Sequence, residues 1–518
     1  SIQTMVKLVV RKVFVLLLAG FAASRKDIPS CLGRFAHDDD TRTWSDRSGN
    51  RTAPLTVVYP GDVAEVAGVM SCVHSLNLSW HAVSGRHFYQ GIGDAMSSPV
   101  SSTEDELVLI DVRGLCKDEN IAVIVDELGT SATVTVPAGC PNGRLLSVIP
   151  PGFLFPVGNC PTVGVGGYVL GGGISDVSRY AGLGCDALVS LSMVRSDGTE
   201  VDSTSDPDVL YAACGGGVGP GAQIDGVVTS FVLKLTPSLT DTYARITVLV
   251  NAEGTPDALV ALQDMLASED SRYFGMGGGG VIGVLRELDV GLVLNLLFLG
   301  AGDDGLALLR EAGVLDDARS SAFVEEFGSF QDAMAVSMAQ EGIGMDMAVA
   351  CELFGCDEFT GLISPSASPA IASMLSDLES PLLDKHSSLW QARQHAYPVP
   401  GYMLRGLDRQ TWARVTEVAM TPAVDDDGEA LCSRHYVLLA HLAGGEIRAR
   451  DASASAYPWR EDTMLVTWLN GMDPVETRAC EAEAARYEAA FAAGSVALDR
   501  AYANYPGSPT YNGRVSYL

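Results

Sequence analysis

The pattern of apolar and polar residues divides the chain into two regions. Between Leu55 and about Pro237, short β-branched runs alternate with turn residues, which is typical of strands. A helix is predicted over Asp62–Ser75, where apolar residues recur at helical spacing after a Pro-Gly start signal. This region is expected to be an α+β domain with strands at Leu55–Tyr59, Leu107–Val112, Ile121–Leu128, Ala132–Val136, Leu188–Val194 and Val227–Leu235.

The second region, from about Ser238 to Cys480, alternates longer helical patterns with strands. Helices are predicted at Pro256–Ala267, Gly305–Ala312 and Ala367–Leu378, and strands at Arg245–Asn251, Leu292–Leu299, His435–Leu442 and Met464–Leu469. The simplest architecture is a sheet with helices on one side. The tail, Pro474–Asn504, is rich in Ala and Glu and has a helical period.

Composition narrows the class of protein. The chain has 518 residues, 47% of them hydrophobic, which is enough for several buried cores. Its 64 acidic and 34 basic side chains give a formal charge of −30, which argues against a nucleic-acid partner because such partners bind clustered Lys and Arg. No apolar run reaches the ~18 residues needed to span a bilayer, so we expect no integral membrane contact.

The first residues are typical of a targeting segment. Basic residues Lys7, Arg11 and Lys12 precede an apolar stretch over 13–23, and small residues follow. We interpret residues 1–24 as a signal peptide; a buried first helix is the alternative. Two glycosylation sequons, at Asn50 and Asn77, agree with a secreted glycoprotein.

The chain has eleven cysteines, an odd number, and none forms a C-x-x-C pair. A structural zinc site therefore has little support, and no metal is expected. Cys351 and Cys356 are close enough in sequence to close a small disulfide loop, but separate thiols are equally compatible. The odd count leaves one cysteine for a role other than a disulfide.

The densest chemical signal is the segment Gly158–Gly173, with seven glycines in sixteen residues. Glycine allows a positive φ and exposes backbone N–H groups to anions such as a pyrophosphate. The spacing matches neither the Rossmann fingerprint nor a phosphate-binding loop with Lys-Ser/Thr. A merely flexible loop is the alternative, although the interleaved apolar residues indicate packing.

A second motif precedes it, Ser84-Gly-Arg-His-Phe-Tyr-Gln-Gly91. Taken alone, His87 is compatible with a turn histidine or with a cofactor ligand. Further motifs follow at Ser178–Asp186, Asp208–Gly217, Gly226–Thr229, Gly444-Gly445, Ala456–Arg460 and Tyr502-Ala-Asn-Tyr505.

Together these motifs resemble the berberine bridge enzyme-like family of FAD-linked oxidases, which have the vanillyl-alcohol oxidase or PCMH-type fold. The resemblance covers roughly residues 28–506. It implies an α+β fold: a two-subdomain FAD-binding domain over 28–237, an antiparallel-sheet substrate domain over 238–480 with helices on one side, and a C-terminal segment, 481–518, that returns to the FAD domain. It also implies a disulfide between Cys31 and Cys72.

The prediction of the cofactor also comes from the resemblance. It implies FAD bound covalently twice, through His87 to the 8α-methyl group and through Cys160 to ring carbon 6. The protein would then supply placement and electrostatics for chemistry that belongs to the flavin. The cofactor-binding residues it implies are Ser84, Gly85, Arg86, His87, Tyr89, Gly91, Cys160, Val163, Gly164, Gly167, Tyr168, Gly171, Gly173 and Val228.

Several positions depart from the family pattern. Val83 and Arg86 replace an Arg and a Gly, and Tyr168 replaces a His expected near the flavin. Counting from Arg460 places Val466 where related enzymes have a Glu, so a carboxylate base there is excluded. What remains for the base is Tyr505, supported by Tyr502. A tyrosine normally titrates near pH ~10, so it needs an environment that stabilises its phenolate.

The function implied is a secreted, FAD-dependent oxidase. It would transfer a hydride from an alcohol carbon, preferably of a carbohydrate, to FAD and pass the electrons to O₂; Val163 is expected to leave room for oxygen. Its partners would be a small-molecule alcohol or carbohydrate and O₂, and we expect a monomer. The alternatives are a dehydrogenase of aromatic alcohols or other secondary metabolites, and an inactive flavin-binding descendant, which Arg86, Tyr168 and the short stretch after Tyr505 would explain.

Overall fold

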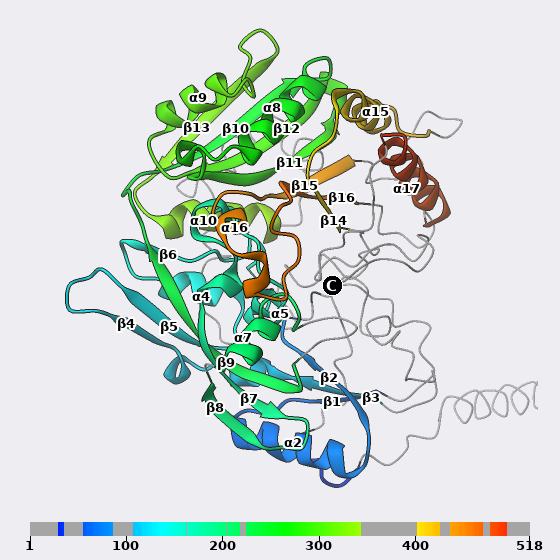
Figure 1. Ribbon diagram of the computed structural model, residues 1–518. Helices are drawn as coiled ribbons and strands as arrows, with labels where there is room; N and C mark the ends of the chain where they lie inside the picture. Colours follow the sequence, from blue (N-terminus) through cyan, green and yellow to red (C-terminus); the bar gives the residue numbers. More distant parts are fainter. Residues whose placement is uncertain are drawn as a thin grey trace, which may run out of the picture.

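Figure 1 shows the computed structural model, in which the antiparallel sheet and its helices, which follow residue 237, lie above a part with mixed strands and helices, residues 55–237, called the mixed part below. The structure describes residues 29–35, 55–85, 87, 107–161, 163–204, 206–217, 224–342, 401–424, 436–469 and 477–494.

The first sheet has three parallel strands in the order β1 (Leu55–Val58), β3 (Leu107–Asp111) and β2 (Ser79–Val83). Helix α2 (Val63–Ser75) begins as predicted, because the Asp62 side chain accepts a hydrogen bond from the Glu65 amide and caps the first turn. The apolar face of α2 is buried in the core of the mixed part.

The second sheet contains β4 (Ala122–Val125), β5 (Ala132–Pro137), β9 (Gly226–Pro237), β7 (Leu188–Arg195) and β8 (Glu200–Thr204), in that order and all antiparallel. The short strand β6 (Phe153–Leu154) pairs with β9. The same region of the chain contains the short helices α4 (Asn142–Val148), α5 (Val165–Leu170), α6 (Ser178–Ala181) and α7 (Pro207–Ala213). Both sheets share one apolar core, as expected for two subdomains of one unit.

The third sheet is entirely antiparallel. Its order is β13 (Ser320–Phe327), β10 (Tyr243–Asn251), β12 (Val290–Phe298), β11 (Met276–Leu285), β15 (Tyr436–Leu442), β16 (Met464–Leu469) and β14 (Gly401–Leu404). One face packs into a separate core with α8 (Thr255–Ala267), α9 (Gly302–Glu311), α15 (Arg409–Met420) and α17 (Thr477–Ala492).

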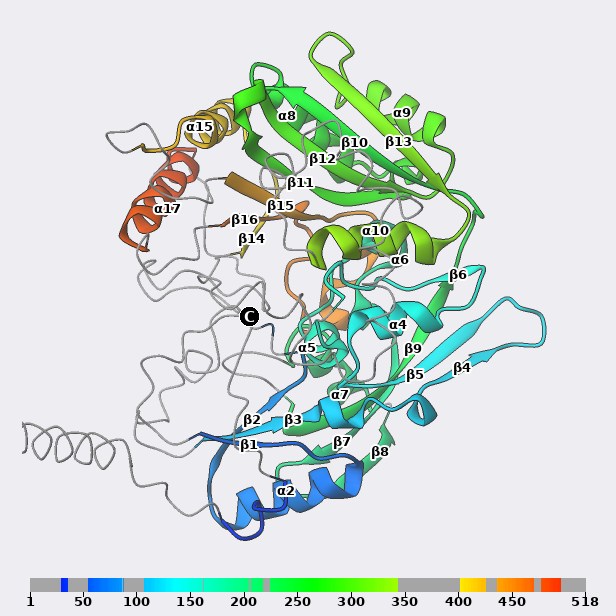
Figure 2. The same cartoon turned by 180° about the vertical axis from the view of Figure 1, so that it is seen from behind.

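The opposite face of this sheet is turned toward the mixed part. Helix α10 (Phe330–Gly342) lies between the two, with Phe330, Met334 and Met338 in the core of the mixed part (Figure 2). The short helix α16 (Glu446–Ala449) contacts α6. The expectation of helices on one side therefore holds for four helices, whereas α10 covers part of the other face.

The α+β fold predicted from the sequence is confirmed, and the strands and helices expected in the described residues are present. The sequence analysis did not predict the strands β2, β6, β8, β11, β13 and β14. In β11 the reason is plain, because the strand begins Met-Gly-Gly-Gly-Gly, a composition disfavoured in strands. The predicted helix at Ala367–Leu378 lies outside the described residues. Within the described ranges, no helix has the length and hydrophobicity that crossing a membrane requires.

Candidate active site

The two motifs singled out in the sequence meet in the structure. A Cβ added at Gly164 would lie 1.8 Å from Ser84 Oγ and 2.3 Å from the Gly85 nitrogen, so only glycine allows this contact. The Ser84 hydroxyl donates to the Ala138 carbonyl at 2.7 Å, and the Gly166 amide donates to the same oxygen at 2.9 Å. The end of β5 therefore joins the segment before His87 to the segment after Cys160.

Cys160 is half-buried and lies outside the three disulfides of the described residues. His87 is also half-buried and follows directly on the Ser84-Gly85 contact. Both side chains thus belong to segments that the close contact at Gly164 holds together. This placement is compatible with two attachments to one cofactor.

Fewer backbone amides are free to bind an anion at the start of α5 than the number of glycines in this segment indicates. The Val165 amide donates to the Cys140 carbonyl at 2.8 Å, and the Gly166 amide is bound to Ala138. Gly167 differs, because an added Cβ there would meet nothing within 4 Å. Of these three residues, Gly167 alone faces open space.

Tyr168 is buried and forms part of the packing under this loop. Its hydroxyl lies 2.6 Å from the Pro156 carbonyl and 3.0 Å from the Ile174 carbonyl. Its ring touches the positions where Gly158 and Gly173 would carry a Cβ. The Tyr168 hydroxyl therefore lies within hydrogen-bond distance of backbone carbonyls, and its ring packs against the glycine-rich segment 158–173.

The remaining predicted residues are placed as follows. Val163 is half-buried against the core, and its amide donates to the Cys160 carbonyl at 3.3 Å. Val228 is buried on β9, and Gly171 ends α5. The predicted residues outside the described ranges are Arg86, Tyr89, Gly91, Tyr502 and Tyr505.

Several buried polar atoms around these motifs fit a polar cofactor. Both side-chain atoms of Asn142, Oδ1 of Asn159 and Oγ1 of Thr229 are shielded from solvent and have no hydrogen-bond partner among the described residues. An unsatisfied buried polar group costs about 1–3 kcal/mol, so such atoms are usually found where a ligand or ordered water binds. A flavin, with donors and acceptors on its ring, could satisfy them, and the residues present fit that group.

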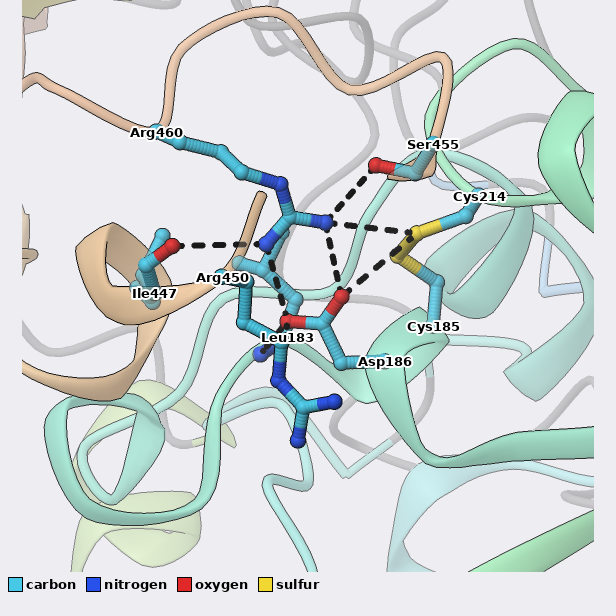
Figure 3. The surroundings of a disulfide bond; sticks show 8 residues. All are labelled: Leu183, Cys185, Asp186, Cys214, Ile447, Arg450, Ser455 and Arg460. Carbon is cyan, nitrogen blue, oxygen red and sulfur yellow. Dashed lines mark hydrogen bonds and ion pairs between the residues drawn. A yellow bond between two sulfur atoms is a disulfide. The ribbon is translucent and has the colours of Figure 1, made fainter. Parts of the chain in front are cut away.

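The C-terminal motif docks onto the mixed part through a buried ion pair (Figure 3). Arg460 Nη2 lies 2.7 Å from Asp186 Oδ1, and Nη1 lies 3.1 Å from Oδ2, so the pair is bidentate. The two side chains are 1% and 5% exposed. Arg460 also donates to the Ser455 hydroxyl at 2.7 Å. Two motifs far apart in the sequence thus hold each other in place.

Three disulfides are present in the described residues. Cys31–Cys72 confirms the pairing that the resemblance implied. Cys116–Cys140 and Cys185–Cys214 were not assigned from the sequence. Cys185 and Cys214 lie close to Asp186, but the disulfide and the ion pair with Arg460 already occupy these three side chains (Figure 3). This cluster is therefore a structural clamp.

The third sheet presents a largely apolar face to this region. Along β16, Val466 packs into the core with the helices, whereas Leu465 packs into the core of the mixed part. Because side chains alternate along a strand, Thr467 shares the face of Leu465. Val466, at the position counted from Arg460, therefore points away from the mixed part, and Thr467 lies on the face turned toward it. Thr467 Oγ1 is buried without a partner among the described residues.

A residue that the sequence did not single out lies on the same face. His441 pairs with Leu465 across β15 and β16, is half-buried, and has an Nδ1 atom without a hydrogen-bond partner in the described part. Burial lowers the pKa of His441, and the nearby Asp176 charge opposes that shift only in part. A neutral imidazole is therefore favoured. No motif surrounds His441 in the sequence that could have marked it.

Comparison with known proteins agrees with these observations. Residues 54–204 match the family described as FAD binding domain. Berberine bridge enzyme-like 1 of Arabidopsis thaliana is 32% identical over 190 residues, 36% of this chain and 32% of that protein. Reticuline oxidase of Papaver somniferum is 28% identical over 263 residues, 50% of this chain and 45% of that protein. The matches thus span less than half of these relatives.

Solved structures show the same fold over most of the chain. The xylooligosaccharide oxidase from Myceliophthora thermophila, in complex with xylobiose, superposes with a TM-score of 0.66 and 18% identity, covering 93% of this chain and 90% of that one. Physcomitrella patens BBE-like 1 superposes with a TM-score of 0.64 and 16% identity, covering 92% and 90%. Residues 54–204 therefore form an FAD binding domain, and the chain has the PCMH-type fold of the berberine bridge enzyme-like FAD-linked oxidases that its sequence resembles.

Proposed function

We propose that this chain is a secreted FAD-dependent oxidase. It takes a hydride from an alcohol carbon of a carbohydrate and passes the electrons to O₂, giving hydrogen peroxide. One observation carries the proposal: the segments bearing His87 and Cys160 are held together by the contact of Gly164 with Ser84 and Gly85. The segments that carry these two residue types, both able to attach a flavin, therefore meet in an FAD binding domain, which supports the proposal.

FAD would be held by His87 and Cys160 and by the polar atoms left without partners nearby. Asn142 and Thr229 supply these atoms, and Gly167 leaves space beside the loop. When bound, the flavin supplies the hydride-accepting ring. The chain's own residues fix its place and exclude water, since the segment from Gly158 to Gly173 is largely buried.

An alcohol must lose its hydroxyl proton as its hydride leaves, so a basic group within hydrogen-bond reach is required. We propose Tyr505 as that base, with Tyr502 beside it. Val163 would regulate access of O₂ to the flavin. In this proposal the FAD-binding domain extends over 28–237 and the substrate domain over 238–480, which agrees with the two separate cores of the described residues.

Carbohydrate substrates are supported by the names of the structural neighbours. These include the xylooligosaccharide oxidase above, a chitooligosaccharide oxidase with a TM-score of 0.66, and the grass pollen allergen Phl p 4, described as having glucose dehydrogenase activity. A Phl p 4 variant with an Ile-to-Val and an Asn-to-His change is described as a glucose oxidase, which parallels the role proposed for Val163. Secretion is supported by the three disulfides, which persist mainly in oxidising compartments.

The test is a screen of the purified holoprotein against D-glucose, xylobiose, chitobiose and a set of aromatic alcohols. We expect at least one sugar to bleach the flavin spectrum without oxygen and to release hydrogen peroxide in air. Reduction by aromatic alcohols alone would change the substrate class, and reduction without peroxide would indicate a dehydrogenase. A flavin that no alcohol reduces would show an inactive descendant.

Covalent attachment is tested separately. Acid-precipitated protein should stay yellow, and tryptic flavopeptides should contain His87 and Cys160. The Cys160→Ala variant should keep the histidyl link and bind FAD, but oxidise substrate more slowly. Flavin recovered entirely in the supernatant would contradict both links.

A further inference from the structure

A buried hydrogen-bond network lies directly beside Cys160 and is not used by the proposed chemistry. Asp176, in the turn between α5 and α6, has a side chain that is 1% exposed. Its Oδ1 accepts from Asn159 Nδ2 at 2.8 Å. Its Oδ2 accepts from Arg245 Nη1 at 2.8 Å and from the Ser337 hydroxyl at 2.9 Å. The carboxylate thus joins the residue next to Cys160 to strand β10 and helix α10.

The carboxylate of Asp176 is fixed by these contacts. A buried carboxylate is tolerated only when it is paired and its oxygens are hydrogen-bonded, because losing its hydration costs several kcal/mol. Burial by itself would raise the pKa of Asp176, but the attraction of Arg245, the electrostatic interaction with His441 and the hydrogen bond from Asn159 outweigh this and lower it. Asp176 is therefore an anion at neutral pH and a strong acceptor for Asn159.

The backbone of the same turn is also held by the third sheet. A Cβ added at Gly277 would lie 1.9 Å from the Asp176 carbonyl oxygen, so β11 packs directly against the turn. Arg245, Ser337 and Gly277 come from three elements of the second region, and Asn159 comes from the FAD-binding part. The Cys160 loop is thus hydrogen-bonded through one carboxylate to the other half of the molecule.

We infer that Asn159 and Asp176 are positioning residues that hold the Cys160 thiol in place for its bond to the flavin, so that this second link forms only when the sheet domain is docked. The inference rests on the covalent attachment in the proposed function. Forming the bond replaces the S–H bond of Cys160 and a ring C–H bond by one C–S bond. The two hydrogens and two electrons reduce the flavin and then pass to O₂, which becomes hydrogen peroxide.

His87 provides an internal control. It follows β2, and none of the hydrogen bonds of Asp176 described above involves its segment. Weakening the network should therefore slow the Cys160 link and leave the His87 link unchanged. A general loss of folding would instead reduce both links together.

The experiment compares wild type, Asn159→Ala and a matched control, Asn251→Ala. Asn251 also makes a side-chain hydrogen bond, accepting from the Gly254 amide at 2.8 Å, but lies at the end of β10 in the other half. Each protein is produced with FAD and sampled over time. It is then denatured and alkylated with iodoacetamide, so that mass spectrometry counts free Cys160 thiol and both flavopeptides. This readout does not depend on turnover.

We expect wild type and Asn251→Ala to carry both links. Asn159→Ala should carry the His87 link in full, while its Cys160 link forms about tenfold more slowly, because one hydrogen bond to a charged group is lost. Asp176→Asn should have at least the same effect; if the unpaired Arg245 prevents folding, Asn159→Ala and Ser337→Ala decide the matter.

Wild-type kinetics of the Cys160 link in Asn159→Ala would overturn the inference, as would an equal loss of both links at an unchanged melting temperature. A wild-type protein without any Cys160 link would overturn the proposed bicovalent attachment as well. That result is read from wild type alone, so the two failures are distinguishable.

Discussion

The two halves of the candidate site are built differently. In the FAD-binding half, loops approach one another so closely that single glycines are required, as at Gly164, and polar groups such as Tyr168 are bound to backbone carbonyls. In the sheet half, regular strands present an apolar face on which His441 and Thr467 stand out as polar. Close backbone contacts therefore shape the FAD-binding half, whereas regular strands with a few polar side chains shape the sheet half.

Buried guanidinium groups hold these halves together. Arg460 and Arg245 each bind a carboxylate of the FAD-binding half. Arg179, on α6, instead donates to the carbonyls of Leu266, Ala443 and Tyr273 in the sheet half. Burial lowers the pKa of Arg179 to about 10, so it stays charged at neutral pH. The interface thus depends on a few directed contacts whose loss should be felt in both halves.

The largest effect is expected from Arg460→Ala. Removing one partner of a buried pair leaves Asp186 as an uncompensated charge and costs about 3–5 kcal/mol of unfolding free energy. Urea unfolding monitored by flavin fluorescence and by circular dichroism measures this loss in both halves. The control is Arg310→Ala, whose exposed pair with Asp317 should contribute at most about 1 kcal/mol. Equal effects of the two variants would contradict the clamp.

The second-largest effect is expected from a variant that changes the rate of flavin reduction but not cofactor binding. Tyr505→Phe should keep the flavin spectrum and both covalent links but slow flavin reduction by roughly two to four orders of magnitude, the range typical of lost general-base catalysis. Stopped-flow reduction without oxygen gives the rate. Tyr211→Phe, at an exposed position on α7, is the control and should reduce normally. Near-normal reduction in Tyr505→Phe would move the role to another residue.

Much of the FAD-binding half was predictable from the sequence, because its close contacts and its motifs require particular residue types at particular positions. Glycines mark positions of close approach, and His87 and Cys160 stand in motifs with recognisable spacings. The short β-branched runs predicted the strands β1, β3, β4, β5, β7 and β9, but not β2, β6 and β8. The Cys31–Cys72 pair followed from the resemblance. The bonding of the Val165 and Gly166 amides to Cys140 and Ala138 could not be foreseen, since it depends on a tertiary contact.

The sheet half was less predictable, because its informative residues depend on strand register. Strand β11 was missed because its glycines are needed for close packing, for example of Gly277 on Asp176, and this need overrides strand propensity. The face on which Val466 lies could not be predicted from the sequence, because a shift of one residue reverses every side chain of a strand. His441 belongs to no sequence motif. Its burial beside Leu465 and near Asp176 depends on the tertiary arrangement of β15, β16 and the turn that carries Asp176.

A smaller effect is expected in the sheet half, where His441 should make the free energy of unfolding depend on pH. Burial lowers the pKa of His441 below its ordinary value of 6.5, so the unfolded chain takes up a proton there before the folded one does. Stability contributed by the neutral ring is complete above pH 6.5 and is lost as pH falls toward the lowered pKa. The slope due to one proton is at most about 1.4 kcal/mol per pH unit.

His441→Leu should therefore lose less stability than wild type between pH 7.5 and 5, as measured by urea midpoints. His441→Asn, which stays polar but does not titrate in this range, should behave like His441→Leu. Asp176, which faces His441, and Arg245, which is paired with Asp176, are present in all three proteins. Parallel curves for wild type and both variants would show that the ring titrates as in water.

The smallest effect concerns a single methylene in the FAD-binding half. Val163 is half-buried against the core, three positions after Cys160, and its amide is bound to the Cys160 carbonyl. Interiors are close-packed, so the extra methylene of leucine would fill space that oxygen needs beside the flavin. Val163→Leu should slow reoxidation of the reduced protein by about tenfold, the lower end of what one methylene controls in an apolar pocket, with reduction by substrate nearly unchanged. Stopped-flow reoxidation measures this, with Val189→Leu, at an exposed position on β7, as control. A wild-type protein that stays reduced for minutes in air would be a dehydrogenase despite Val163. In that case the FAD-binding half would hold the cofactor, but Val163 would not determine which electron acceptor it uses.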